Sequence, residues 1–245
     1  SNNRENNLKI GGNDGNTVEF WLKKAAFDTT ATHKEVILDV FISSSLSSSD
    51  DYARLRIELS GHSDATNTLS PFYVTYMSGT SGFFRENIGE NLTTSCVTDD
   101  KWHHYALRFK NTASNVVTDL FIDGKHNDRI QTGTTVDYVS GALVATIGAL
   151  GMETSGSKES DQFDYPLRGY GRLSASIDEF RYWKTWRSSK KIQRYWFDQV
   201  GAGTNTDPAN THLGVYYKFN EGIVGGEDVD KTVLDYSGRI SNGTW

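Results

Sequence analysis

Apolar and polar residues alternate with a period of two along most of this chain, and this pattern limits the possible folds more than any other feature. In TVEFWLK, residues 17–23, the side chains of Val18, Phe20 and Leu22 share one face. ARLRIELS, residues 53–60, alternates in the same way. Successive side chains of a β-strand point to opposite faces of the sheet, so this alternation predicts strands with one buried face.

The alternating runs are short and are separated by Gly, Asn, Asp and Ser. Pro is scarce, with 3 residues, whereas Gly is plentiful, with 23, as is typical of many short strands joined by turns. Residues 101–110 and 117–125 form a predicted hairpin, and Asp123 and Gly124 tolerate positive φ at its far end. We expect strands at 17–23, 35–42, 53–60, 71–78, 82–89, 101–110, 117–125, 142–150, 173–183, 213–220 and 232–238.

One segment has a helical period instead. In SSKKIQRYWFDQV, Ser188 or Ser189 can cap the first turn, and Ile192 and Tyr195 fall on one side. The chain therefore reads as a two-sheet antiparallel sandwich with one short helix near its C-terminal third.

Charge and length restrict the class of protein further. The net charge is −6 and no basic run occurs, so nucleic acid is not an expected partner. No apolar run is long enough to cross a membrane, and Cys96 is the single cysteine, which excludes an internal disulfide. The chain starts at Ser1 without an initiator Met and contains no linker. We therefore expect one domain over residues 1–245, excerpted from a longer protein.

The acidic pair Asp178 and Glu179 allows a catalytic, a metal-binding or a structural interpretation. Ile177 lies an odd number of residues before Phe180, so both side chains reach the core only if the strand contains a β-bulge near the pair. A bulge exposes backbone N–H groups from which Asp178 can accept hydrogen bonds. We therefore favour a structural role over catalysis.

Five motifs, in this order, resemble the laminin-G-like, concanavalin-A-like family: TVEFWLKK, DDKWHHYALRFKN with DLFIDGK, ATIGAL, ASIDEFRYWKTWRSSKKIQRYW, and LGVYYKFNEG with VLDYSG. The resemblance covers nearly the whole chain and implies an all-β, two-sheet antiparallel jelly-roll sandwich. It places Asp178 and Glu179 in the family's strand-to-helix signature, and we expect Trp102 and Trp183 to be structural as well. The segment that closes the chain resembles one that often opens such a module, so it either completes the sandwich or begins another. The abundance of Thr, Ser and Asn also resembles virion structural proteins of tailed phages.

The same sandwich hosts glycanases, so catalysis has to be considered. The related glucanases carry an E-x-D-x-x-E pattern on one strand, which is not found here, and Glu19 and Asp39 each stand alone. His103 and His104 alternate across a strand, so they cannot hold one metal ion together. We therefore expect no enzymatic activity. A glycan-cleaving enzyme is the third hypothesis, ranked after the two non-catalytic functions given below.

The long loop after ATIGAL is a candidate calcium site, because it contains Glu153, Asp161 and Asp164, together with Glu159. Ca²⁺ prefers several carboxylate and carbonyl oxygens. In pentraxins, distant relatives of the resembled sandwich, the loop at the matching place binds Ca²⁺, although this chain lacks their compact acidic motif. A solvated acidic loop without metal is the alternative.

Two aromatic segments are candidate sugar platforms, because a pyranose ring has an apolar face and a rim of hydroxyl groups. The candidate ligand-binding residues are Tyr165, Arg168 and Tyr170 in FDYPLRGYG, and Phe83, Phe84 and Arg85 in GFFRE. Our leading hypothesis is a non-catalytic recognition module for carbohydrate or a cell surface, within a larger extracellular or virion protein. The second is an assembly domain that contacts other virion or surface subunits.

Overall fold

The computed structural model describes residues 7–27, 34–42, 52–61, 70–139, 143–151, 169–200, 209–221, 231–239 and 241–244. Within them the strands are β1 (Asn16–Lys23), β2 (Lys34–Ile42), β3 (Ala53–Ser60), β4 (Phe72–Ser78), β5 (Ser81–Asn87), β6 (Trp102–Asn111), β7 (Val116–Ile122), β8 (Lys125–Thr132), β9 (Leu143–Ile147), β10 (Ser176–Trp183), β11 (Leu213–Tyr217), β12 (Thr232–Val233) and β13 (Gly243–Thr244). The helices are α1 (Thr94–Val97), α2 (Ser189–Tyr195) and α3 (Ala209–His212).

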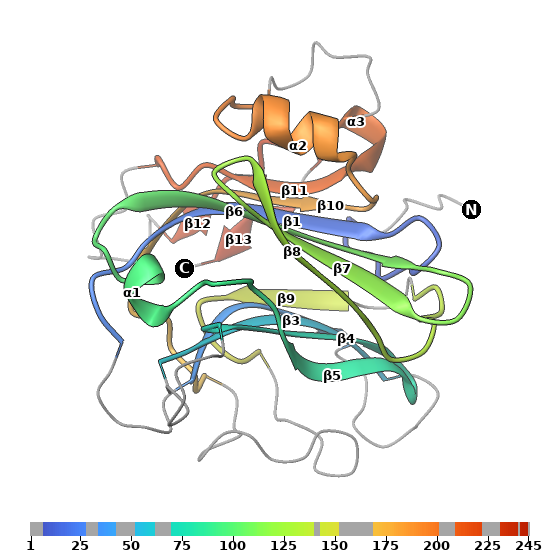
Figure 1. Cartoon of the computed structure of the whole chain (residues 1–245). Coiled ribbons are helices and arrows are strands. Elements are labelled where there is room, and N and C mark those ends of the chain that lie inside the picture. The colour runs from blue at the N-terminus through green and yellow to red at the C-terminus, as the bar shows by residue number, and fades with distance from the viewer. Residues whose placement is uncertain are drawn as a thin grey trace.

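Two large sheets form the two layers of the molecule (Figure 1). One sheet has six strands in the order β11-β10-β1-β6-β7-β8, and the other has five in the order β5-β4-β3-β2-β9. All strand pairs in both sheets are antiparallel, and α2 lies on the outer side of the six-stranded sheet (Figure 1). The predicted fold class, an all-β two-sheet antiparallel jelly-roll sandwich, is confirmed.

The core lies between the two sheets and follows the predicted alternation. Val18, Phe20 and Leu22 of β1 are each at most 2% exposed, and so are the inward residues of β3. Burying a large aliphatic or aromatic side chain stabilises a fold by about 1.5–3 kcal/mol. The inward half of each alternating strand therefore supplies most of the driving force for folding.

The outward residues of β3 differ from the expectation of a solvent-facing strand. Arg54, Arg56 and Glu58 are each 0% exposed. Arg54 donates two hydrogen bonds of 2.8 Å to Asp39 on β2, and Arg56 Nε donates to Glu58 Oε2 at 2.9 Å. Buried charges are tolerated when they are paired, so this outer face of the five-stranded sheet is a buried polar layer.

Strand β8 is not predicted by the sequence pattern. Its sequence, KHNDRIQT, contains one apolar residue, Ile130, and it forms an edge of the six-stranded sheet. The turn that joins it to β7 contains Asp123, with φ 47°, and Gly124, with φ 73°. Positive φ at this pair is therefore confirmed, and it creates a second hairpin that the alternation alone does not reveal.

The predicted bulge in β10 is confirmed. Between the pairs Glu19–Arg181 and Trp21–Asp178, β10 has two residues where β1 has one. Glu179, inside the bulge, has φ 50°. The carboxylate of Asp178 accepts a hydrogen bond of 2.8 Å from the backbone N–H of Glu179, which is the backbone contact that the spacing argument anticipates.

Helix α2 begins where the sequence places its cap. The Ser188 hydroxyl accepts a hydrogen bond from the backbone N–H of Lys191, and Ile192 packs against Ala106 and Phe121 on the sheet. Tyr195, on the same predicted side, is 43% exposed. Among the described residues, no helix is long and apolar enough to cross a membrane.

Candidate ligand-binding site

A buried carboxylate, Glu19 on β1, lies on the outer face of the six-stranded sheet. Its side chain is 0% exposed; Arg187 donates to its Oε1, and Arg181 Nη1 lies 3.5 Å from its Oε2. Burial disfavours the charged form, but the two guanidinium groups outweigh burial and lower the pKa of Glu19 below its ordinary value. Its negative charge is therefore fully compensated inside the protein.

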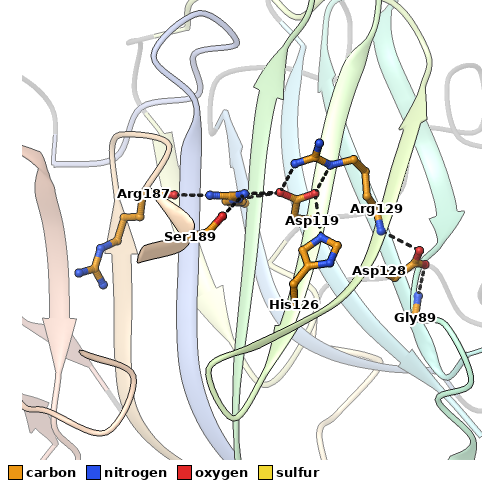
Figure 2. A network of polar contacts seen from close by, with 8 residues as sticks. Gly89, Asp119, His126, Asp128, Arg129, Arg187 and Ser189 are labelled. Atoms are coloured by element: carbon orange, nitrogen blue, oxygen red, sulfur yellow. Dashed lines mark hydrogen bonds and ion pairs between the residues drawn. The ribbon is translucent and has the colours of Figure 1, made fainter. Parts of the chain in front are cut away.

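A second buried carboxylate, Asp119 on β7, lies at the centre of a larger network of hydrogen bonds and ion pairs (Figure 2). Arg108 Nε donates to its Oδ2 at 2.8 Å, and Arg129 Nε donates to its Oδ1 at 2.6 Å. His126 Nε2 lies 3.4 Å from the same Oδ1. Arg108 also donates to the Ser189 hydroxyl at 2.9 Å, so the network connects β6, β7 and β8 to the start of α2.

The two networks hold the segment after β10 on the sheet. The Arg108 guanidinium lies 3.9 Å from the centre of the Trp186 ring, and that of Arg187 lies 4.0 Å from the centre of the Trp183 ring. Arg108 donates to the backbone carbonyl of Arg187 at 2.6 Å. Cation–π contacts and charged hydrogen bonds of this kind are strong when buried. These carboxylates and arginines are therefore occupied by one another.

The acidic pair of β10 is engaged in the same region. Glu179 Oε2 accepts hydrogen bonds from Arg181, at 3.0 Å, and from Tyr216, and its Oε1 accepts one of 2.9 Å from Gln199. Burial raises the pKa of Asp178. The pair thus joins β10 to β11 and to the chain after α2, which is the arrangement of bracing carboxylates.

The neighbouring histidines have different partners, in agreement with their alternation. His103 lies between Asp123, whose Oδ2 is 2.7 Å from Nδ1, and Asp99, whose Oδ2 is 3.2 Å from Nε2. His104 is 1% exposed and packs edge-on against Trp21. They do not form a joint site.

A pocket of about 490 Å³ is lined in part by the turn between β6 and β7. This turn lies at the end of the sandwich away from α1 (Figure 1). Three segments far apart in the sequence contribute to it: the turn before β1, the β6–β7 turn, and the chain after β8. The lining residues are Gly11, Asn13, Asp14, Asn111, Thr112, Ala113, Thr135, Val136, Asp137 and Tyr138. Amide, hydroxyl and carboxylate groups around one aromatic ring suit a small polar ligand.

The wall of this pocket, which we call the Tyr138 pocket, is built around Asn111. The Asn111 side chain donates to the Val136 carbonyl at 2.9 Å and accepts from the Val136 N–H at 2.9 Å. A Cβ atom on Gly12 would lie 2.2 Å from Asn111 Nδ2, and one on Gly11 would lie 3.3 Å from the Tyr138 ring. The two glycines therefore allow these side chains to pack against the turn before β1.

The two carboxylates at the Tyr138 pocket, Asp14 and Asp137, differ in their partners. Lys9 Nζ donates to Asp14 Oδ2 at 2.7 Å, and this hydrogen bond lowers the pKa of Asp14. The same ammonium lies 5.4 Å from the centre of the Tyr138 ring, which is 60% exposed. Asp137 is exposed; its backbone N–H donates to the Ser78 hydroxyl at 2.8 Å, and within the described part of the chain its carboxylate forms no ion pair. Asp137 can therefore accept hydrogen bonds from a ligand.

Among the described residues, none of the ligand-binding residues expected from the sequence lines this pocket. Tyr165 and Arg168 lie outside the described residues. Tyr170 is 43% exposed. Phe83 is 4% exposed and belongs to the core between the sheets, so its proposed place in an exposed platform is corrected.

Phe84 and Arg85 form cation–π contacts within the five-stranded sheet. The Arg85 guanidinium lies 4.0 Å from the centre of the Tyr73 ring, and that of Arg56 lies 5.7 Å from the centre of the Phe84 ring. Arg85 has φ 50°, and Gly82 has φ 101°. Positive φ at two positions of an edge strand disturbs its regular pairing, so these residues shape the edge β5 more than they form a flat surface.

Of the remaining expected site residues, some lie outside the described residues and others lie within them. Glu153, Asp161 and Asp164 lie outside the described residues, so the calcium site stays a prediction. In the segments that the structure describes, no group of three or more His, Cys, Asp and Glu side chains could hold a metal ion. Trp183 is 4% exposed and packs with Leu213. Trp102 is 43% exposed, and its structural role stays a prediction.

The comparisons with known proteins concern the fold. No protein-family model matches the chain, and no curated protein matches it. The chain is similar to the solved structure of a heptameric SAP-like pentraxin from Limulus polyphemus, with 10% identity and a TM-score of 0.46 over 76% of this chain and 71% of that one.

Two further solved structures are similar to the chain. The binding domain of botulinum neurotoxin serotype G has 10% identity and a TM-score of 0.43 over 81% of this chain and 39% of that one. The mouse laminin α1 chain domains LG4-5 have 12% identity and a TM-score of 0.40 over 76% of this chain and 41% of that one. The laminin domains carry the name of the family that the sequence motifs resemble.

Proposed function

We propose that this protein is a non-catalytic recognition module that binds carbohydrate in the Tyr138 pocket, as part of an extracellular or virion protein. The observation that carries the proposal is the pocket itself. It combines Tyr138, which is 60% exposed, with carboxylate, amide and hydroxyl groups from two turns and from the chain after β8.

Sugar recognition needs this combination of groups. The apolar face of a pyranose stacks on an aromatic ring, and its hydroxyl groups donate to carboxylates and accept from amides. Tyr138 offers the ring, Asp137 and Asp14 offer acceptors, and Asn13 offers an amide. Asn111 is occupied by Val136 and serves to position the wall.

A glycan array followed by calorimetry tests the proposal. Tyr138→Ala should lower the affinity for the bound glycan about tenfold, because the stacking surface is lost. Tyr195→Ala is the matched control, since Tyr195 is also a half-exposed tyrosine but lies on α2. Each titration is repeated with Ca²⁺ and with a chelator, which tests the predicted calcium site separately. Equal affinity of the Tyr138→Ala variant and the parent protein would refute the pocket as the binding site.

A second candidate function, an assembly domain that contacts other virion or surface subunits, rests on a different region. Phe197 is 62% exposed and Tyr195 is 43% exposed at the end of α2, next to Trp196. Exposed aromatic residues that lie together often mark protein contacts. Light scattering across a concentration series tests this function: a defined oligomer that Phe197→Ser dissociates supports it, and a monomer at all concentrations counts against it.

A further inference from the structure

The Tyr138 pocket has a definite electrostatic character. Among the described residues that line it, the only charged side chains are Asp14 and Asp137, and none is Lys, Arg or His. Lys9, a basic group beside the pocket, has a side chain that is 17% exposed and is already bonded to Asp14; the charges of His212 and Lys110 also lower the pKa of Asp14. The pocket therefore presents one compensated carboxylate and one uncompensated carboxylate to a ligand.

This arrangement discriminates between classes of sugar. A carboxylate or sulfate on the ligand would meet Asp137, which forms no ion pair among the described residues, and like charges at short range repel each other. Neutral hydroxyl groups can donate to the same carboxylate, and a protonated amine adds an ionic attraction to that hydrogen bond.

From these charges we propose that the Tyr138 pocket selects its sugar by charge. It binds amine-bearing sugars most tightly, neutral sugars less tightly, and acidic sugars such as uronates and sialates least. Asp137 is the residue that sets this order. The inference rests on the proposed carbohydrate-binding function and adds the class of ligand to it.

The size of the expected effect follows from the exposure of Asp137. Ion pairs at a protein surface contribute about 0.2–1 kcal/mol. The dissociation constants of an amine-bearing sugar and its neutral counterpart should therefore differ about two- to fivefold. The preference should also weaken with salt, because exposed charges are screened.

Protein-observed NMR titrations test the order directly. The probes are methyl glycosides of glucosamine, glucose and glucuronate, and the corresponding galacto series, at low salt and a pH at which the amine is protonated. The shifts of the Gly11, Ala113 and Tyr138 amides report on the pocket. We expect the amine-bearing sugar to bind most tightly and the acidic sugar most weakly.

Two variants separate selection at the pocket from the overall negative charge of the protein. Asp137→Asn should make the affinities for the amine-bearing and neutral sugars equal. Asp198→Asn removes the same charge from an exposed residue beyond the end of α2, and it should leave the order unchanged. An acidic sugar that binds as tightly as the neutral one, or an order that survives Asp137→Asn, would overturn the inference while the carbohydrate-binding function stands. If no sugar shifts these amides, the proposed function itself is refuted.

Discussion

The outer face of the six-stranded sheet and the Tyr138 pocket use the same types of side chain in opposite ways. On the sheet, Glu19 and Asp119 are each 0% exposed, and each is paired with two arginines. At the pocket, Asp14 keeps a side chain that is 65% exposed beside one lysine, and Asp137 has no ion pair among the described residues.

This difference separates carboxylates that hold the fold from carboxylates that can meet a ligand. A buried charge without partners is costly, so the sheet has to supply cations for each acid that it buries. An exposed carboxylate is solvated by water, which a ligand hydroxyl or amine can replace. Whether a carboxylate is already paired with cations of the protein, rather than the number of acidic residues, therefore indicates where a ligand can bind.

The largest expected effect comes from removing one buried charge. Glu19→Gln should lower the free energy of unfolding by about 3–5 kcal/mol, because it leaves Arg181 and Arg187 without their shared carboxylate. Urea unfolding followed by tryptophan fluorescence measures the change. A loss below about 1 kcal/mol, the range of exposed ion pairs, would show that the two regions do not differ as argued.

The next effect is a pH dependence of stability that originates at His104. Burial lowers the pKa of His104 from 6.5 to about 4. Between these values the unfolded chain binds a proton that the folded protein does not. The free energy of unfolding should therefore fall as the pH decreases from about 7 to 4, with His104 contributing on the order of 3 kcal/mol.

The variant His104→Phe isolates this contribution. It should flatten the decrease between pH 6.5 and 4, measured as urea unfolding midpoints. His103 is the contrasting neighbour: burial opposes its protonation, but hydrogen bonds to Asp123 and Asp99 outweigh burial and raise its pKa. Its stabilisation is present below the unfolded pKa and is lost as the pH rises through the folded value, so His103→Gln should change stability in the opposite sense. Parallel pH profiles of the parent and both variants would contradict this assignment.

An intermediate effect is expected at the wall of the pocket. In Gly12→Ala the new Cβ would lie 2.2 Å from Asn111 Nδ2, and the Asn111 side chain is held by two hydrogen bonds to Val136. Relieving this overlap should cost about 1–3 kcal/mol and displace the segment that carries Tyr138. Loss of sugar binding together with this destabilisation is expected. Gly243→Ala is a control for the insertion of a methyl group, because its Cβ would come no closer than 3.5 Å to its neighbours. Unchanged binding by Gly12→Ala would show that Asn111 does not set the pocket wall.

The sandwich was predictable because its determinants are local in sequence. Alternation marks the buried face of β1 and β3, the odd spacing of Ile177 and Phe180 requires the bulge, and Ser188 caps α2. Each of these signals lies within a few residues. Strand β8 was missed because its single apolar residue leaves no alternation, and its pairing depends on β7.

There is a physical reason why the Tyr138 pocket could not be predicted from the sequence. Its residues come from 11–14, 111–113 and 135–138, which only the pairing of the strands brings together. In sequence, Asn13-Asp14-Gly15 reads as an ordinary acidic turn. The one local signal for an exposed aromatic residue was that Tyr138 lies in a polar segment without alternation.

The burial of Arg54 and Arg56 was also not predictable. Alternation assigns the residues of a strand to two faces, but it does not show whether other parts of the chain cover the polar face.

The smallest expected effect is the most direct check on the comparison. Asp137→Asn should change the free energy of unfolding by less than about 0.5 kcal/mol, as is usual for exposed positions without special contacts. Asp14→Asn should cost no more than about 1 kcal/mol, because its bond to Lys9 is an exposed ion pair. Both are measured by urea unfolding beside Glu19→Gln. If either variant destabilises the protein as much as Glu19→Gln does, then the pocket carboxylates also hold the fold, and their exposure does not mark them for a ligand.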